Sequence, residues 1–248
     1  MNRYLVPLGF FAALVISVLL WLNMPTLIGE QMGKQLVDAG PLVPALIMLL
    51  ILQISFVIER MMSLQKAAGR GSMPLFLKNV RGKLKAGDIA GAIDLCSKQR
   101  GSAANVLRAG LDRYNRVKSE GAPKDKIVAE TQAAIQEASG LETPLLERNL
   151  IALSTIASIS TMIGLLGTVL GMIRSFAALG TSGAVDASKL AVGISEALIN
   201  TAGGLFVAIL GIVMYNVFVT RVDSFNYMMD EASYEVLQHL AGSASDQH

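Results

Sequence analysis

The chain has 248 residues, of which 52% are hydrophobic and only 16% are charged, and its mean hydropathy is +0.51. Because a soluble domain carries about a quarter charged residues, this composition excludes an ordinary soluble protein and indicates a membrane protein. The net charge of +2 gives no reason to expect a nucleic-acid partner, and a single cysteine excludes an internal disulfide or a cysteine-rich metal site.

Residues 1–40 are predicted to hold an extra N-terminal transmembrane helix followed by a loop. The run 4–22 has no charge and is long enough to cross a hydrocarbon core of about 30 Å. A signal peptide is the alternative, since Arg3 precedes the apolar run. No small-residue cleavage pattern follows Trp21, so a retained helix is favoured.

A second transmembrane helix is predicted at 41–60, with its apolar run at 41–58, and a helical region is predicted at 61–149. Glycine and proline breaks divide the helical region into expected helices at 74–87, 88–99, 103–117 and 123–149. We expect the last of these to run into the next membrane helix, with Pro144 bending or breaking it.

Asp88 is the predicted N-cap of the second of these helices. Ile89, Ala92, Ile93 and Cys96 then form an apolar stripe at helical spacing, which makes Cys96 a small buried residue rather than a reactive one. The region has no phosphate loop, nucleophile elbow or zinc spacing. We therefore expect no catalytic residue, no metal and no cofactor.

Residues 150–220 are predicted to form two core membrane helices, with apolar runs at 150–173 and 191–219. Gly164, Gly167 and Gly171 lie three and four residues apart in the first of them, so they share one helical face. Small residues in this pattern let a neighbouring membrane helix approach closely. We expect the glycine face to pack against another helix.

Three polar side chains in these two spans are the candidate functional residues. Thr168 and Thr201 each lie roughly 10 Å below the outer boundary, if that boundary falls near Phe176 and Ile194. Two hydroxyls at this depth on antiparallel helices would form one polar level. The alternative is that they only hold a helix bundle together. Glu196 is an intramembrane carboxylate, which usually faces a partner or water, although a hydrated entrance residue or a helix N-terminal charge remains open.

The basic residues predict the orientation of the spans. Sixteen of the 21 lysines and arginines lie in 59–149, whereas the loops at 23–40 and 177–190 hold one each. Basic residues concentrate on the cytoplasmic side of a membrane protein. We therefore expect 59–149, both termini and the C-terminal tail at 221–248 to be cytoplasmic.

Two segments, GLLGTVLGMIRSF at 164–176 and GISEALINTAGGLFVAILGIVMYN at 193–216, resemble the paired core helices of the MotA/TolQ/ExbB proton-channel family. The likeness is strongest to ExbB and TolQ. It extends upstream through IERMMSLQK at 58–66 and covers about residues 41–235. The resemblance implies an all-α, polytopic membrane protein whose long transmembrane helices extend into a cytoplasmic helical bundle.

The resemblance also implies an inner-membrane subunit that assembles as a homopentamer, in membrane lipid, around helices of an ExbD-like or TolR-like single-span partner. That partner would supply the aspartate that takes up and releases protons. Thr168 and Thr201 would line the proton path and Glu196 would lie near its outer end. A TonB-like or TolA-like protein would convey the resulting work to the outer membrane. Gly203 and Gly204 would serve as further helix-packing residues.

The chain departs from the family pattern at three positions. Thr161 and Leu210 stand where the family often has prolines, so we expect straighter helices. Asn200 stands where a small residue is expected, and a distinct partner helix is one hypothesis for it. The alternative functions are a flagellar-type, MotA-like stator subunit, a non-conducting membrane scaffold and a secondary transporter of a small solute.

Overall fold

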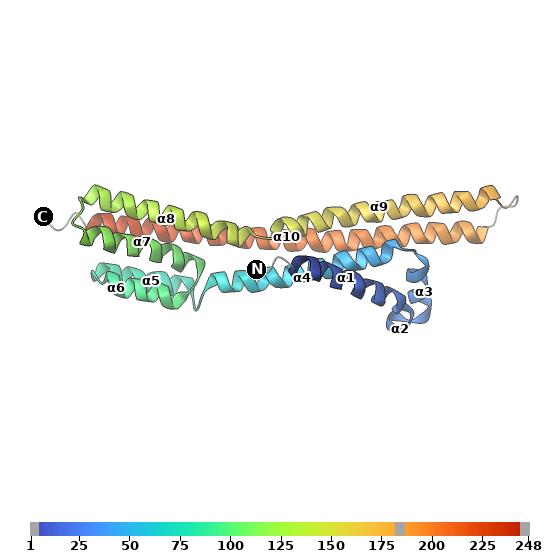
Figure 1. Ribbon diagram of the computed structural model, residues 1–248, viewed down its shortest axis with the longest axis horizontal. Helices are drawn as coiled ribbons and strands as arrows, with labels where there is room; N and C mark the ends of the chain where they lie inside the picture. Colours follow the sequence, from blue (N-terminus) through green and yellow to red (C-terminus); the bar gives the residue numbers. More distant parts are fainter. Residues whose placement is uncertain (1–4, 182–186, 244–248) are drawn as a thin grey trace. The chain divides into compact units, whose positions relative to one another are not determined.

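The computed structural model describes residues 5–181 and 187–243, and these form ten α-helices and no strand (Figure 1). The helices are α1 (Leu5–Leu22), α2 (Met24–Ile28), α3 (Glu30–Asp38), α4 (Leu42–Ala68), α5 (Met73–Lys85), α6 (Ile89–Gln99), α7 (Ser102–Ser119), α8 (Lys124–Glu147), α9 (Leu150–Thr181) and α10 (Ala187–Ser243). The predicted all-α fold class is confirmed.

The chain divides into two compact units. The first, here called the membrane unit, comprises Met1–Glu59 and Asn149–Val217. The second unit comprises Arg60–Arg148 and Phe218–His248. The helices α4 and α10 contribute residues to both units.

Three helical stretches, Leu42–Lys85, Lys124–Ala177 and Leu190–Leu240, contain an apolar window long enough to cross a membrane. They include α4, α9 and α10 and agree with three of the four predicted spans. In α1 the apolar stretch Phe11–Leu22 is shorter than a span. The fourth span, at 4–22, therefore stays a prediction.

Within the membrane unit, α9 and the first part of α10 lie side by side, and a small apolar core joins them to α4 (Figure 1). Leu49, Ile156 and Val207 form the centre of this core, one from each helix. Large apolar side chains elsewhere in the unit are exposed, among them Leu165 and Phe206. An apolar outer surface is what a lipid-facing helix bundle requires.

The second unit has a larger hydrophobic core, to which α5, α6, α7 and the end of α10 contribute. Its buried residues are Phe76, Val80, Leu84, Ala92, Cys96, Ala104, Leu107, Leu111, Tyr114, Ala232, Val236 and Leu240. The core contains Ala92 and Cys96 of the predicted apolar stripe, with Ile89 and Ile93 packed against it. Asp88 caps α6 as expected, because its Oδ1 accepts a hydrogen bond from the Gly91 amide at 2.8 Å.

The sequence predicts only a C-terminal tail at 221–248, whereas the described part of this segment continues α10 to Ser243. Val222, Met229 and Val236 are buried at intervals of seven, so one face of this helix packs inward. The charged residues between them make the segment polar on average, so its overall polarity does not predict this buried face.

The helical segment expected to run from 123 into the third span, with a bend or break at Pro144, is interrupted three residues later, between α8 and α9. The helix α8 ends at Glu147, and Asn149 has a positive φ of 61°. Asparagine is one of the few residues other than glycine that adopts this conformation readily. Pro144 lies inside α8, in its last turn, so the helical hydrogen bond that its missing N–H removes lies close to the end of the helix.

Arg60 stabilises the end of α8. Its side chain is buried, and Nη1 lies 3.3 Å from the carbonyl oxygen of Leu146 and 3.5 Å from that of Leu145. A guanidinium is favourable here because the last carbonyls of a helix have no helical donor and carry partial negative charge.

Candidate functional site

The glycines of α9 pack directly against α10. A Cβ at Gly164 would lie 3.2 Å from the Cα of Gly204, and a Cβ at Gly171 would lie 2.7 Å from the carbonyl oxygen of Gly193. A Cβ at Gly167 would lie 2.9 Å from Cγ of Asn200. Each is closer than an ordinary van der Waals contact, so glycine at these positions permits the observed approach of the two helices.

The two glycines of α10 face different helices. A Cβ at Gly204 would lie 2.5 Å from the carbonyl oxygen of Ser160 in α9. A Cβ at Gly203 would lie 3.2 Å from Cδ1 of Leu46 in α4. Of the two, Gly204 belongs to the tight α9–α10 contact and Gly203 lies against α4.

Thr168 and Thr201 donate to carbonyl groups of consecutive residues. The Thr168 hydroxyl lies 2.6 Å from the carbonyl oxygen of Leu165, and the Thr201 hydroxyl lies 3.2 Å from that of Gly164. Consecutive residues differ by about 1.5 Å along a helix axis, so the two hydroxyls lie at closely similar depth in α9. Both side chains are half-buried.

The surroundings of the two threonines differ. Thr168 lines an open, mainly apolar groove on α9, together with Val169, Met172, Ile173 and Phe176. Thr201 instead lies at the contact between α9 and α10, because its hydroxyl crosses to the Gly164 carbonyl. The hydroxyl of Thr168 therefore borders the outer surface of the unit, and that of Thr201 joins two of its helices.

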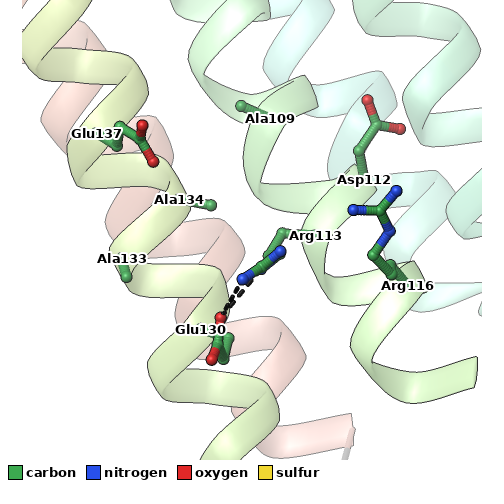
Figure 2. A pocket seen from close by; sticks show the side chains of 8 residues that line it. All are labelled: Ala109, Asp112, Arg113, Arg116, Glu130, Ala133, Ala134 and Glu137. Atoms are coloured by element: carbon green, nitrogen blue, oxygen red, sulfur yellow. Dashed lines mark hydrogen bonds and ion pairs between the residues drawn. The ribbon is translucent and has the colours of Figure 1, made fainter. Parts of the chain in front are cut away.

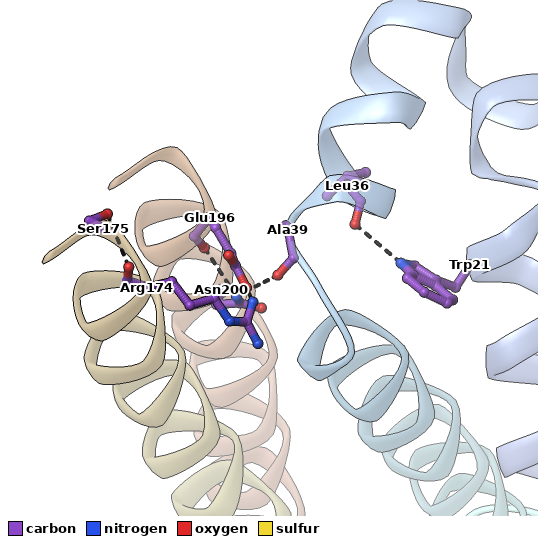
Figure 3. Close-up of polar contacts among 8 residues, drawn as sticks. Trp21, Leu36, Ala39, Arg174, Ser175, Glu196 and Asn200 are labelled. Carbon is purple, nitrogen blue, oxygen red and sulfur yellow. Dashed lines mark hydrogen bonds and ion pairs between the residues drawn. The ribbon is translucent and has the colours of Figure 1, made fainter. Parts of the chain in front are cut away.

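Glu196 is buried and forms an ion pair with Arg174 (Figure 3). The two residues come from the facing ends of α10 and α9. The Glu196 side chain is 9% exposed and that of Arg174 is 51% exposed, so the guanidinium reaches from the surface to a carboxylate inside the unit. The guanidinium offsets part of the cost of placing a carboxylate in an apolar surround, and removing it would leave a buried charge unpaired.

The loop between α3 and α4 closes over this ion pair. Gly40 has φ of +91°, and a Cβ there would lie 2.5 Å from Oε1 of Glu196 and 3.2 Å from Nη1 of Arg174. A positive φ and this close approach both require glycine. The backbone of the loop is thus in direct contact with both charged groups.

Asn200 ties the same loop to α10. Its Nδ2 donates to the carbonyl oxygen of Ala39 at 2.9 Å and to that of Glu196 at 3.0 Å. Asn200 is 1% exposed, and its Oδ1 has no donor within the described residues. Figure 3 shows Asn200 between Glu196 and the Ala39 carbonyl.

A cavity of about 270 Å³ lies beside this network. Its walls are Gln35, Asp38, Ala39, Ala191, Val192, Ser195 and Glu196. Two carboxylates, a hydroxyl and an amide therefore line one space between the end of α3 and the start of α10. Farther along the membrane unit, Gln53 of α4 is also buried, with an Oε1 that has no donor among the described residues.

A cavity of about 580 Å³ in the second unit lies between α7 and α8 (Figure 2). Arg113 donates from Nε to Oε2 of Glu130 at 3.0 Å, so two of the five charged side chains that line the cavity pair with each other. The lining residues shown in Figure 2 include no serine, threonine, cysteine or histidine. Across residues 5–181 and 187–243, no three His, Cys, Asp or Glu side chains are placed to hold a metal ion.

The comparisons with known proteins match a region that includes α9 and much of α10. The family model described as the MotA/TolQ/ExbB proton channel family matches residues 98–231, which is more than half of the chain. The chain belongs to the MotA/TolQ/ExbB proton channel family. This family member has three apolar helical stretches long enough to span a membrane, and it is a multi-pass membrane protein.

Three curated relatives support the membership. The Tol-Pal system protein TolQ of Pseudomonas aeruginosa is 33% identical over 144 residues, which are 57% of this chain and 62% of the relative. TolQ of Haemophilus influenzae is 38% identical over 121 residues, 48% of this chain and 53% of the relative. The biopolymer transport protein ExbB of Aquifex aeolicus is 36% identical over 117 residues, 47% of this chain and 72% of the relative. The matches to the two TolQ proteins thus cover 62% and 53% of their lengths.

Sequence reasoning missed Arg174 and the loop that holds Ala39 and Gly40. Arg174 carried a usable signal, because a charged residue inside an apolar run calls for a partner. The loop carried none, since neither an alanine carbonyl nor a glycine indicates which distant side chain it will meet.

Proposed function

We propose that this family member is an ExbB-like or TolQ-like subunit of an inner-membrane proton channel. In the proposed assembly it forms a homopentamer around the transmembrane helices of an ExbD-like or TolR-like partner. Both termini and residues 61–149 lie in the cytoplasm, as the distribution of lysine and arginine favours. Proton flow is coupled to work at the outer membrane through a TonB-like or TolA-like protein.

The observation that carries this proposal is the shared depth of the Thr168 and Thr201 hydroxyls, which bond to the carbonyls of Leu165 and Gly164. A hydroxyl can pass a proton through a water chain without holding a fixed charge. Thr168 also borders an open apolar groove, which suits a transmembrane helix of another protein. Glu196 is proposed to lie near the outer end of the same path.

Valine substitutions at the two threonines test the proposal. Valine keeps the shape of threonine and removes the hydroxyl. The complex is purified with its native partners, placed in lipid vesicles, and its proton uptake is measured under an imposed membrane potential. We expect Thr168→Val and Thr201→Val each to lower uptake at least tenfold while the complex still assembles.

Thr155→Val is the matched control. Thr155 lies in the same helix, is exposed, and bonds to the carbonyl oxygen of Ile151 at 2.8 Å in the same local manner. The complex with Thr155→Val should conduct protons as the unchanged complex does. Full proton uptake in both Thr168→Val and Thr201→Val would reject the proposed path along the two hydroxyls. Uptake by the unchanged complex no faster than by empty vesicles would favour a non-conducting scaffold and reject the channel.

A further inference from the structure

We propose that Arg174 and Asn200 are positioning residues that hold the Glu196 carboxylate against the α3–α4 loop, so that the loop and the carboxylate form one unit at the outer end of the ion path. This inference rests on the proposed function for the role of that path. The tie between loop and helix, however, is a property of this chain alone and can be measured without any conduction.

Glu196 is buried in a largely apolar unit, where a carboxylate without a partner is strongly unfavourable. Arg174 supplies the positive charge from the end of the facing helix. Since α9 and α10 are held close by the glycine contacts, the pair has a rigid base on both sides.

The α3–α4 loop lies against the ion pair. Gly40 touches both members of the ion pair, and its positive φ turns the chain into the start of α4. A larger residue at this position would separate the loop backbone from Glu196. The loop is thus shaped around the charged pair.

The amide of Asn200 has one orientation that satisfies its nitrogen. Both groups that face its nitrogen, the carbonyls of Ala39 and Glu196, are acceptors only. This fixes the orientation of the amide and leaves Oδ1 as a buried acceptor with no donor in the described chain. Burying an unpaired acceptor costs stability. The hydrogen bond from Nδ2 to the Ala39 carbonyl is the stabilising contact that offsets this cost.

Glu196 also lines a cavity. The cavity beside the pair is walled by Asp38 and Gln35 of α3 and by Ser195 and Glu196 of α10. Ala39 lies in the same wall, one residue before Gly40. A loop that is tied by Asn200 therefore fixes one wall of the cavity, and the Arg174 pair fixes the carboxylate that faces it.

The tie is tested directly by cysteine labelling. Ala39 is 1% exposed, so an Ala39→Cys thiol in the purified complex should react slowly with a water-soluble maleimide. Adding Asn200→Ala should raise its labelling rate at least tenfold, because the loop loses its bond to α10. Adding Ser195→Ala, an exposed neighbour of the cavity, is the control and should leave the rate unchanged. Equal rates in all three proteins would overturn the tie.

The role of Arg174 is tested by proton uptake in the reconstituted native complex. We expect Arg174→Gln to lower uptake at least tenfold with normal assembly, and Arg174→Lys to restore at least a third of it, because lysine keeps the charge but not the planar fork. The exchange Arg174→Glu with Glu196→Arg should conduct better than either single change. Lys34→Gln, which removes an exposed cation paired to Glu30, is the control and should have no effect.

The outcomes separate this inference from the proposed function. Loss of uptake in Thr168→Val with unchanged uptake in Arg174→Gln would overturn the positioning role and leave the channel intact. A fall in uptake that only follows a fall in assembled complex would also overturn it, as would failure of Arg174→Lys to recover any uptake. Unchanged uptake in the threonine variants would reject the proposed threonine path, and no uptake by the unchanged complex would reject the channel itself, whatever the labelling rates show.

Discussion

The side-chain nitrogen of Asn200 lies 2.9 Å from the backbone oxygen of Ala39, which joins positions 161 residues apart in the chain. The polar character of Asn200 had suggested a distinct partner helix. In the structure its nitrogen bonds instead to two carbonyls of the same chain. The unusual residue is explained by the loop that this chain places over Glu196.

Asn200→Ala should therefore destabilise the membrane unit. The change leaves the buried carbonyl of Ala39 without its donor, which costs about 1–3 kcal/mol of unfolding free energy. Thermal unfolding of the purified protein should show a lower midpoint than that of the unchanged chain. Ser195→Ala, at an exposed position of the same helix, should unfold at the original temperature. An unchanged midpoint in Asn200→Ala would contradict the assigned contact.

Two glycine-to-alanine changes should shift stability in opposite directions. In Gly167→Ala the new Cβ would lie 2.9 Å from Cγ of Asn200, so the packing must open at a cost of about 1–3 kcal/mol. In Gly140→Ala the new Cβ meets nothing within 4 Å, and alanine favours the α8 helix by about 0.5–1 kcal/mol. Thermal unfolding of both variants measures the two signs. A higher unfolding midpoint in Gly167→Ala would show that the contact between α9 and α10 is looser than described.

Gln53→Met should leave the protein as stable as before or make it more stable. Gln53 is 2% exposed and its Oε1 has no hydrogen-bond donor in the described chain. Methionine has a similar length and needs no donor, so the unfavourable burial of that oxygen is removed. Gln53→Glu places an unpaired charge at the same site and should lower the unfolding midpoint strongly. A large loss of stability in Gln53→Met would reveal an essential polar contact.

Cys96 should resist thiol reagents until the second unit opens. Burial raises the pKa of the Cys96 thiol from 9.0 to about 12, and the nearby Asp112 carboxylate adds to the rise. The thiolate is the reactive form, so maleimide labelling at pH 8 should be slow in native protein and fast in denaturant. Rapid native labelling would contradict the burial of the α6 stripe.

The same shift predicts a direction for stability against pH. Below pH 9 the thiol is neutral in the folded and the unfolded chain, and its contribution is fully present. Between pH 9 and about 12 only the unfolded chain loses the proton, so the contribution of Cys96 falls as pH rises. Cys96→Ala should lose this part of the pH dependence, which denaturation at several alkaline pH values would measure.

Local features of the sequence predicted much of the fold. Apolar runs of membrane length located α4, α9 and α10, because a span must satisfy its backbone internally and present apolar side chains to lipid. The spacing of Gly164, Gly167 and Gly171 predicted a packed face, since positions three and four apart share one side of a helix. Asp88 was recognisable as a cap because a cap bonds within its own first turn.

The sequence by itself determined the long apolar helices, the small-residue face of α9 and the family motif that the last two spans carry, but not α2, α3 or the end of α10. Only the tertiary structure decided that Arg174 pairs with Glu196, that Asn200 bonds to Ala39, and that Gly40 lies against the charged pair. Helical periodicity acts over a few residues, whereas these contacts depend on how two helices are rotated about their axes and where a distant loop turns. No local pattern encodes those rotations, so the pairing of the charges emerges only when the helices pack.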